Sequence, residues 1–119
     1  MATYDLPMVQ GQRLRRGLRW TRDGVPQSLA GYSFRAQIRA KESATSALLL
    51  DLTPHLTLNA DGVTLDLEVP ATITADLSPR DFKDTASWDM FLWPTGAPED
   101  AFLFVQGAAS LDPSTTDMT

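Results

Sequence analysis

Tyr32-Ser33-Phe34-Arg35-Ala36-Gln37-Ile38-Arg39-Ala40 is the stretch of sequence that decides the fold. Its apolar residues occupy every second position, and polar residues occupy the positions between them. This period of two is typical of a β-strand with one face in a core and the other in solvent. Residues 63–69 repeat the pattern, with Val63, Leu65, Leu67 and Val69 on the apolar face. The chain is therefore expected to be built from half-buried strands.

Working outward from this stretch, we expect further strands at residues 3–9, 12–20, 48–52, 56–58, 87–93 and 101–108. Asp23-Gly24 and Asp61-Gly62 are hairpin signals, because both central positions of the favoured turn need a positive φ. Ala71 to Leu77 is the one expected helix, ended by Ser78-Pro79. The pattern predicts an all-β fold, an antiparallel β-sandwich of seven to eight strands with one short corner helix. A closed small barrel is the competing architecture.

The chain has 119 residues, which favours one domain. We assign residues 1–110 to a single β-sandwich domain and residues 111–119 to a polar C-terminal tail. The N-terminus lacks a signal-peptide pattern, and the longest aliphatic run, Ala47 to Leu50, is far shorter than the ~20 residues that cross a bilayer. Shared parity on three strands predicts a core of Tyr32, Phe34, Ile38, Leu65, Leu67, Trp88, Met90 and Leu92.

The residue types needed for most catalytic sites are scarce. There is no cysteine and only one histidine, His55, so thiol catalysis and clustered His or Cys metal sites are excluded. No phosphate-binding glycine motif or nucleophile elbow occurs. Four acids, Asp76, Asp81, Asp84 and Asp89, lack the spacing of a calcium loop. We therefore expect no enzyme and assign no catalytic, cofactor-binding or metal residue.

Charge is segregated along the chain. Residues 1–41 carry eight basic and two acidic residues, whereas residues 42–119 carry thirteen acidic and two basic ones. Arg13, Arg15 and Arg19 are therefore expected to lie toward acids such as Asp66 and Glu68, either on the same chain or on a neighbouring copy. The overall net charge of −5 disfavours nucleic acid and anionic membrane as partners.

The last two expected strands are apolar on both faces. In Trp88-Asp89-Met90-Phe91-Leu92-Trp93, one face holds Trp88, Met90 and Leu92, which leaves Asp89, Phe91 and Trp93 on the other. A strand of this kind is buried between layers or covered by a partner. We predict an interface of Phe91, Trp93, Leu103 and Val105, or of the alternate pair Phe102 and Phe104, together with the basic strands. A carbohydrate platform on Phe91 and Trp93 is the alternative.

The turn and strand residues carry a resemblance. Asp23-Gly24-x-Pro26-x-x-Leu29-x-Gly31-Tyr32-x-x-Arg35-x-Gln37-Ile38-Arg39 resembles small virion proteins of tailed bacteriophages and prophages, above all the immunoglobulin-like N-terminal domain of baseplate upper proteins. Gln10-Gly11, residues 62–74, Trp88-Asp89-x-x-Leu92 and Gly107 also match. In place of a closing Val-Thr-Arg-like segment, this chain has Leu111-Asp112-Pro113, so we expect a shortened last strand.

The resemblance implies that the antiparallel β-sandwich is immunoglobulin-like. It also implies a structural protein of the virion, acting as a connector or adaptor in the tail, baseplate, collar or head fibre. It implies other virion proteins and further copies of the chain as partners, with assembly in the cytoplasm of the bacterial host. It offers no catalytic residue and no cofactor. A host-surface carbohydrate-binding module is the alternative function.

Overall fold

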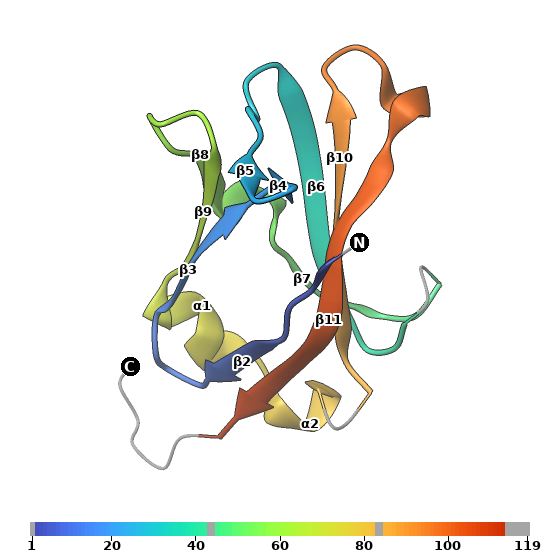
Figure 1. Ribbon diagram of the computed structural model, residues 1–119. Coiled ribbons are helices and arrows are strands. Elements are labelled where there is room, and N and C mark those ends of the chain that lie inside the picture. Colours follow the sequence, from blue (N-terminus) through green and yellow to red (C-terminus); the bar gives the residue numbers. More distant parts are fainter. Residues whose placement is uncertain (1, 43–44, 83–84, 114–119) are drawn as a thin grey trace.

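The computed structural model describes residues 2–42, 45–82 and 85–113 (Figure 1). The expected strands all form, and the structure describes eleven strand segments, of which three contain only two residues each. They are β1 (Ala2–Thr3), β2 (Leu6–Val9), β3 (Leu14–Arg19), β4 (Thr21–Arg22), β5 (Val25–Pro26), β6 (Tyr32–Arg39), β7 (Leu48–Asp51), β8 (Leu56–Leu58), β9 (Thr64–Val69), β10 (Ser87–Pro94) and β11 (Phe102–Asp112).

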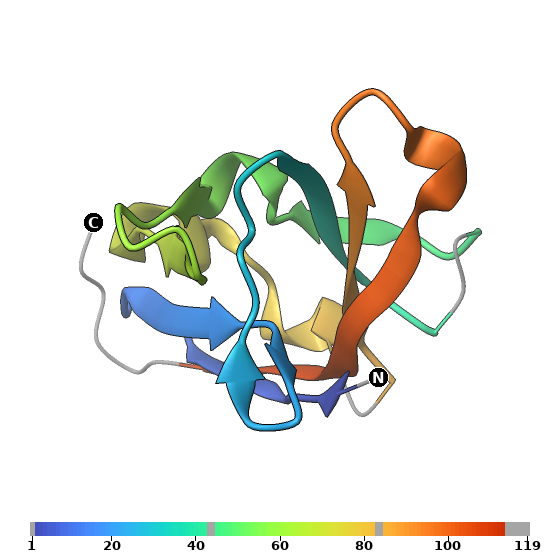
Figure 2. The same ribbon diagram turned by 45° about the horizontal axis from the view of Figure 1, so that its top comes forward.

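The strands form two facing sheets. The larger sheet has the order β1-β11-β10-β6-β7, with β2 also beside β11, and the smaller sheet has the order β3-β9-β8. The short strands β4 and β5 pair only with each other among the described residues. Figures 1 and 2 show the smaller sheet on one side of the molecule and β6, β10 and β11 on the other. Because the two sheets share no described strand, the fold is a two-layer arrangement and the closed barrel is wrong.

The prediction of a wholly antiparallel arrangement is also wrong. Strands β1 and β2 both run parallel to β11, with Thr3 beside Gln106 and Leu6 beside Ala109. Both strands lie in the segment expected as one continuous strand from residue 3 to residue 9. The segment breaks at Tyr4 and Asp5, where the Asp5 carboxylate accepts a hydrogen bond from the backbone N–H of Ala108. A side chain thus takes the place of a ladder bond at the break.

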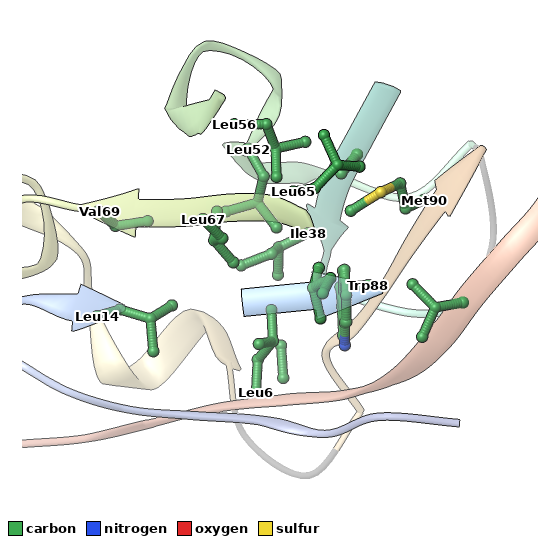
Figure 3. Close-up of a cluster of buried hydrophobic side chains, with 14 of the residues drawn as sticks. Leu6, Leu14, Ile38, Leu52, Leu56, Leu65, Leu67, Val69, Trp88 and Met90 are labelled. Carbon is green, nitrogen blue, oxygen red and sulfur yellow. The ribbon is translucent and has the colours of Figure 1, made fainter. Parts of the chain in front are cut away.

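The core lies between the sheets and contains most of the predicted residues (Figure 3). Ile38, Leu65 and Leu67 are fully buried, as are the three alternate residues of β10. Tyr32 and Phe34, also predicted as core, are only partly buried, although both pack against the core. They lie in the first half of β6, beyond the residues that β7 pairs with. Tyr32 instead meets the edge of Trp20 at 5.6 Å between ring centroids.

Two α-helices, not one, connect β9 to β10. The expected corner helix is α1 (Ala71–Asp76), and it is followed by α2 (Pro79–Phe82). Pro79 was predicted to end the helical region, but proline is compatible with the first turn of a helix because its missing N–H has no partner there. Phe82 of α2 is 1 % exposed and belongs to the core. The helices therefore close the lower end of the sandwich in Figure 1.

The two hairpin signals have different outcomes. Asp23 and Gly24 both have positive φ, 51° and 79°, and they join β4 to β5 as predicted. At the second signal, among the described residues, only Gly62 has positive φ. Here β8 and β9 are joined by a longer loop, residues 59–63, in which the Asp61 carboxylate accepts hydrogen bonds from the backbone N–H groups of Val63 and Thr64. The longer loop needs only one left-handed residue.

The C-terminal boundary lies later than predicted. Strand β11 continues through Asp112, where Leu111 pairs with Met8 and is 6 % exposed. The expected tail at residues 111–119 and the shortened last strand are therefore wrong at Leu111 and Asp112, because β2 supplies a parallel partner for this end of the strand. Residues 114–119 of the expected tail lie outside the described residues.

Gly107 of β11 lets the N-terminal segment cross closely over the sheet. A Cβ at this position would overlap the carbonyl oxygen of Tyr4 and lie 2.6 Å from its carbonyl carbon. The same oxygen accepts a hydrogen bond of 2.6 Å from the indole N–H of Trp88, the register partner of Gly107. Glycine is needed here because of a close backbone approach. The hydrogen bond to Trp88 and the close approach at Gly107 hold the N-terminal segment against β10 and β11.

Candidate functional site

The candidate site is the outer face of β6, β10 and β11, opposite the core. The antiparallel register aligns Arg35 of β6, Phe91 of β10 and Leu103 of β11 in one row. The next row contains Gln37, Asp89 and Gln106. Trp93 lies beyond Phe91 on the same face, two residues further along β10. We call this surface the outer face, defined by Arg35, Gln37, Asp89, Phe91, Trp93, Leu103 and Gln106.

A β-bulge decides which residues of β11 reach this face. The pairing with β10 shifts between Met90 and Phe91, so that Met90 is opposite Val105 and Phe91 is opposite Leu103. Phe104 is the extra residue of the bulge and is 8 % exposed, while Val105 is 3 % exposed. Phe102 packs against the core and meets Trp20 at 5.4 Å between ring centroids. A bulge changes the parity of a strand, so the core-facing residues of β11 do not all lie at alternate positions.

The predicted interface residues of β11 are therefore only partly correct in placement. Leu103 lies on the outer face with Phe91, whereas Phe104 and Val105 belong to the hydrophobic core and Phe102 packs on it. Their side chains are occupied within the chain, so we withdraw these three from the interface. Phe91 and Trp93 of β10 are on the outer face, and Phe91 is 39 % exposed.

Two opposite charges on the outer face have no partner within the described residues. Arg35 and Asp89 are exposed, and neither forms a hydrogen bond or ion pair with any residue of 2–42, 45–82 or 85–113. Partial burial raises the pKa of Asp89 above its ordinary value of 3.8, with Arg39 acting against this and Glu42 adding to it. Arg39 itself is tethered, since its guanidinium donates to the carbonyl of Ser46 at 2.8 Å and to Gln37 at 3.0 Å.

A hollow of about 520 Å³ lies on this face between β6 and the following loop on one side and β10 on the other. Its lining includes both unpaired charges, Arg35 and Asp89, and both aromatic residues, Phe91 and Trp93. Gln37 and Gln106 add amide groups. A surface that combines aromatic area with polar groups able to donate and accept hydrogen bonds is suited to binding.

The outer face of the smaller sheet is different, because two of its arginines are paired with acids of the same chain. Arg13 forms an ion pair with Glu68 at 3.2 Å, and Arg19 lies 3.9 Å from Asp61 and donates to the Thr64 hydroxyl at 3.0 Å. Arg15 is the cross-strand neighbour of Glu68. Of the two alternatives for the charge segregation, the structure supports pairing inside one sheet. The basic strand is thus a poor candidate for the predicted interface.

The remaining candidate chemistry is dispersed. Within the described residues, no group of three or more His, Asp or Glu side chains is arranged to hold a metal ion. Asp76 lies in α1, Asp81 in α2 and Asp89 in β10, while Asp84 lies outside the described residues. His55 ends a short 3-10 helix, Thr53–His55. In the part of the chain that the structure describes, no helix has the length and hydropathy to cross a membrane.

The sequence predicted the two aromatic residues of the outer face as part of the site, but it did not assign the polar residues of that face to the site. Arg35 and Gln37 were recognised as solvent-facing, and Asp89 as sharing the face of Phe91. Their meeting depends on the register between β6 and β10, which pairs Arg35 with Phe91 and Gln37 with Asp89. Alternation within a strand fixes which face a residue takes but not its neighbour on the next strand.

No protein-family model matches the chain, and no protein of curated function does either. Among solved structures, the chain is similar to the extracellular domain of the voltage-gated sodium channel beta4 subunit, described as a parallel homodimer with a role in cell-cell adhesion, at 11 % identity and a TM-score of 0.43 over 96 % of this chain and 94 % of that one. It is also similar to the insect immune protein hemolin, described with implications for homophilic adhesion, at 13 % identity and a TM-score of 0.48 over 98 % of this chain and 27 % of that one.

Proposed function

We propose that the protein is an immunoglobulin-like assembly module of a bacteriophage particle, which binds a protein partner through its outer face. The observation that carries the proposal is the exposed Phe91, which lies in a row with Leu103 and beside two opposite charges that have no partner in the described part of the chain. Exposed aromatic residues surrounded by polar groups are typical of protein interfaces. The chemistry of the surface suits binding without catalysis.

The immunoglobulin-like assignment is supported by the connectivity of the sheets. Strands β11, β10, β6 and β7 lie side by side in one layer and β3, β9 and β8 in the other. The variable-type immunoglobulin fold divides its strands between two sheets in a similar way. The phage context is supported by the sequence resemblance alone, which includes Arg35 and Gln37 of the outer face and Gly107 of the crossing.

The placement in a virion is tested on particles. We expect the protein in phage particles purified after induction of the host strain that encodes it, in a fixed ratio to the major structural proteins and resistant to high-salt washing. Quantitative mass spectrometry of the purified particles gives this ratio. If the protein is absent from particles but abundant in the lysate, the virion assignment is wrong.

The binding surface is tested with Phe91→Ser. We expect the variant to lose incorporation into particles, because truncating an aromatic residue at the centre of an interface costs about 2 kcal/mol or more, roughly 30-fold in Kd. Val25→Ser is the matched control, since Val25 is 59 % exposed but lies on the β4–β5 hairpin. Equal incorporation of both variants would contradict a role for the outer face.

A carbohydrate-binding module is the second candidate, and the hollow favours it specifically. Trp93 and Phe91 line the same hollow as Asp89 and two amide side chains, a combination that suits stacking on a sugar ring with hydrogen bonds to its hydroxyls. A module of this kind is expected to bind members of an array of bacterial surface glycans, and the Trp93→Ala variant is expected to lose this binding. If no glycan binds the wild-type protein, the second candidate is excluded.

A further inference from the structure

The arrangement of charge on the outer face is self-complementary. Arg35, Gln37, Asp89 and Phe91 form a block of two register pairs, with Arg35 opposite Phe91 and Gln37 opposite Asp89. The two unpaired charges therefore occupy one diagonal of the block, and Gln37 and Phe91 occupy the other. Successive residues on one face of a strand are about 7 Å apart and neighbouring strands about 4.8 Å, so the four side chains are close neighbours.

A two-fold axis that lies in the plane of the face and bisects the Arg35–Asp89 diagonal at right angles has a simple consequence. It exchanges the two ends of that diagonal, so that Arg35 of one copy faces Asp89 of the second copy and Asp89 faces Arg35 in return. Phe91, close to the axis, then meets its own counterpart. An isologous interface requires this property, because each contact must occur twice with its partners reversed.

We propose that two copies of the chain associate face to face through the outer face, with Arg35 and Asp89 of each copy paired reciprocally around a central contact between the two Phe91 side chains. The inference rests on the proposed assembly function and names its partner as a second copy of the chain. Charge complementarity selects this partner, since the chain supplies one guanidinium and one carboxylate at matched positions and leaves both unpaired in the described structure.

The neighbouring charges fit this pairing. Arg39 acts on the charge of Asp89 but forms no ion pair with it in the described structure, since its guanidinium donates to the Ser46 carbonyl and to Gln37. The hollow beside the block, which Trp93 also lines, gives the side chains of the second copy room to enter. The raised pKa of Asp89 has partial burial as its main cause, and a guanidinium brought against that carboxylate would lower it again.

Charge reversal gives a test that a structural defect cannot imitate. We expect sedimentation velocity to show a dimer for the wild-type chain and a monomer for Arg35→Glu and for Asp89→Arg, with dimer Kd raised on the order of 100-fold or more, since each variant places like charges opposite each other twice. Mixing the two variants in equal amounts restores association as a heterodimer, because Glu at position 35 then faces Arg at position 89 and the native Asp89 faces the native Arg35.

Arg13→Glu is the control, because Arg13 is exposed but pairs with Glu68 of its own chain. We expect this variant to remain a dimer. The milder Arg35→Gln and Asp89→Asn variants, which introduce no like charge, should weaken the dimer without abolishing it. A far-UV circular dichroism spectrum identical to wild type confirms that each variant is folded.

The outcomes separate this inference from the proposed function. Dimerisation that survives both reversals, or a mixture that stays monomeric after both reversals abolish the dimer, overturns the reciprocal pairing. A wild-type chain that is monomeric in solution also overturns it, yet the assembly function stands if Phe91→Ser still loses incorporation into particles while Val25→Ser retains it. If Phe91→Ser is incorporated normally and the wild type is monomeric, both are wrong.

Discussion

The outer surfaces of the two sheets carry similar residues but use them differently. On the smaller sheet, Arg13 and Arg19 are matched to acids of the same chain. On the larger sheet, Arg35 and Asp89 lie on neighbouring strands and stay unpaired in the described structure, with Phe91 39 % exposed beside them. Both surfaces belong to strands of one fold, so the difference comes from whether an oppositely charged side chain of the same chain lies within reach.

This difference separates charges that stabilise the chain from charges available to a partner. An exposed ion pair contributes little to stability, about 0–1 kcal/mol, but it leaves neither charge free for another molecule. An unpaired guanidinium and carboxylate beside an exposed aromatic residue can be desolvated by a partner with a gain in specificity. The number of arginines on a surface is therefore a poor guide to binding, and their pairing within the chain is a better one.

The contrast between the two surfaces requires that the larger sheet keeps its structure. Gly107→Ala is the substitution expected to destabilise that sheet most. The new Cβ would overlap the Tyr4 carbonyl, which is backbone and cannot rotate away. We expect the free energy of unfolding to fall by about 3 kcal/mol, the upper part of the usual range for overpacking. Urea denaturation measures this change.

Gly17→Ala is the matched control for this change. Gly17 lies in β3 of the smaller sheet, where a Cβ would approach the methyl group of Thr64 no closer than 3.4 Å, an ordinary contact. We expect the free energy of unfolding to change by less than about 0.5 kcal/mol. Equal losses of stability in the two variants would mean that the loss comes from replacing any strand glycine and not from the close approach of the Tyr4 carbonyl to Gly107.

Trp88→Phe tests the same crossing from the other side. The change removes the indole N–H and leaves the Tyr4 carbonyl without the donor that it has at 2.6 Å. Because an unsatisfied buried acceptor costs about 1–3 kcal/mol, we expect a loss of about 2 kcal/mol in the free energy of unfolding. Thermal unfolding followed by near-UV circular dichroism measures it. A variant as stable as wild type would mean that this hydrogen bond has no role in stability.

The comparison itself is sharpened by Arg13→Ala and Arg35→Ala. Arg13→Ala removes an ion pair of the smaller sheet, so we expect a loss of less than about 1 kcal/mol in the free energy of unfolding and no change in association. Arg35→Ala should leave the free energy of unfolding within about 0.5 kcal/mol of wild type, since Arg35 is exposed without a described partner, but should weaken association. The reverse assignment of effects would contradict the distinction between the two surfaces.

Much of the fold could be predicted from alternation, and the exceptions have physical causes. The strands β9 and β10 and the second half of β6 alternate cleanly in burial, so their buried residues were found from the sequence. Strand β11 could not be read in this way, because the bulge at Phe104 places Phe102 and Val105 toward the core at a spacing of three. The parallel strands β1 and β2 were missed because periodicity carries no information on strand direction.

The site was predictable in its apolar part alone. Parity within β10 correctly separated Phe91 and Trp93 from Trp88, Met90 and Leu92, since β10 has no bulge against β6. Whether an arginine is paired depends on distances across strands, which one sequence does not contain. Arg13, Arg15 and Arg19 were therefore assigned to the interface by charge, although the structure matches Arg13 and Arg19 internally and leaves Arg35 unpaired.

The smallest expected effect is a difference in sign between two carboxylates in acid. Hydrogen bonds from Val63 and Thr64 lower the pKa of Asp61 from 3.8, so its stabilising contribution is present above pH 3.8 and is lost as the pH falls through the lowered pKa. Partial burial raises the pKa of Asp89, so the folded state binds that proton more tightly and stability falls as the pH rises from 3.8 through the raised pKa.

Urea denaturation between pH 2 and pH 7 should show Asp61→Asn less stable than wild type at neutral pH, with the deficit shrinking in acid. Asp89→Asn should be more stable at neutral pH, with the advantage disappearing below pH 3.8. Difference curves of the same sign would contradict the contrast, because they would mean that the two sheets hold their carboxylates in equivalent surroundings.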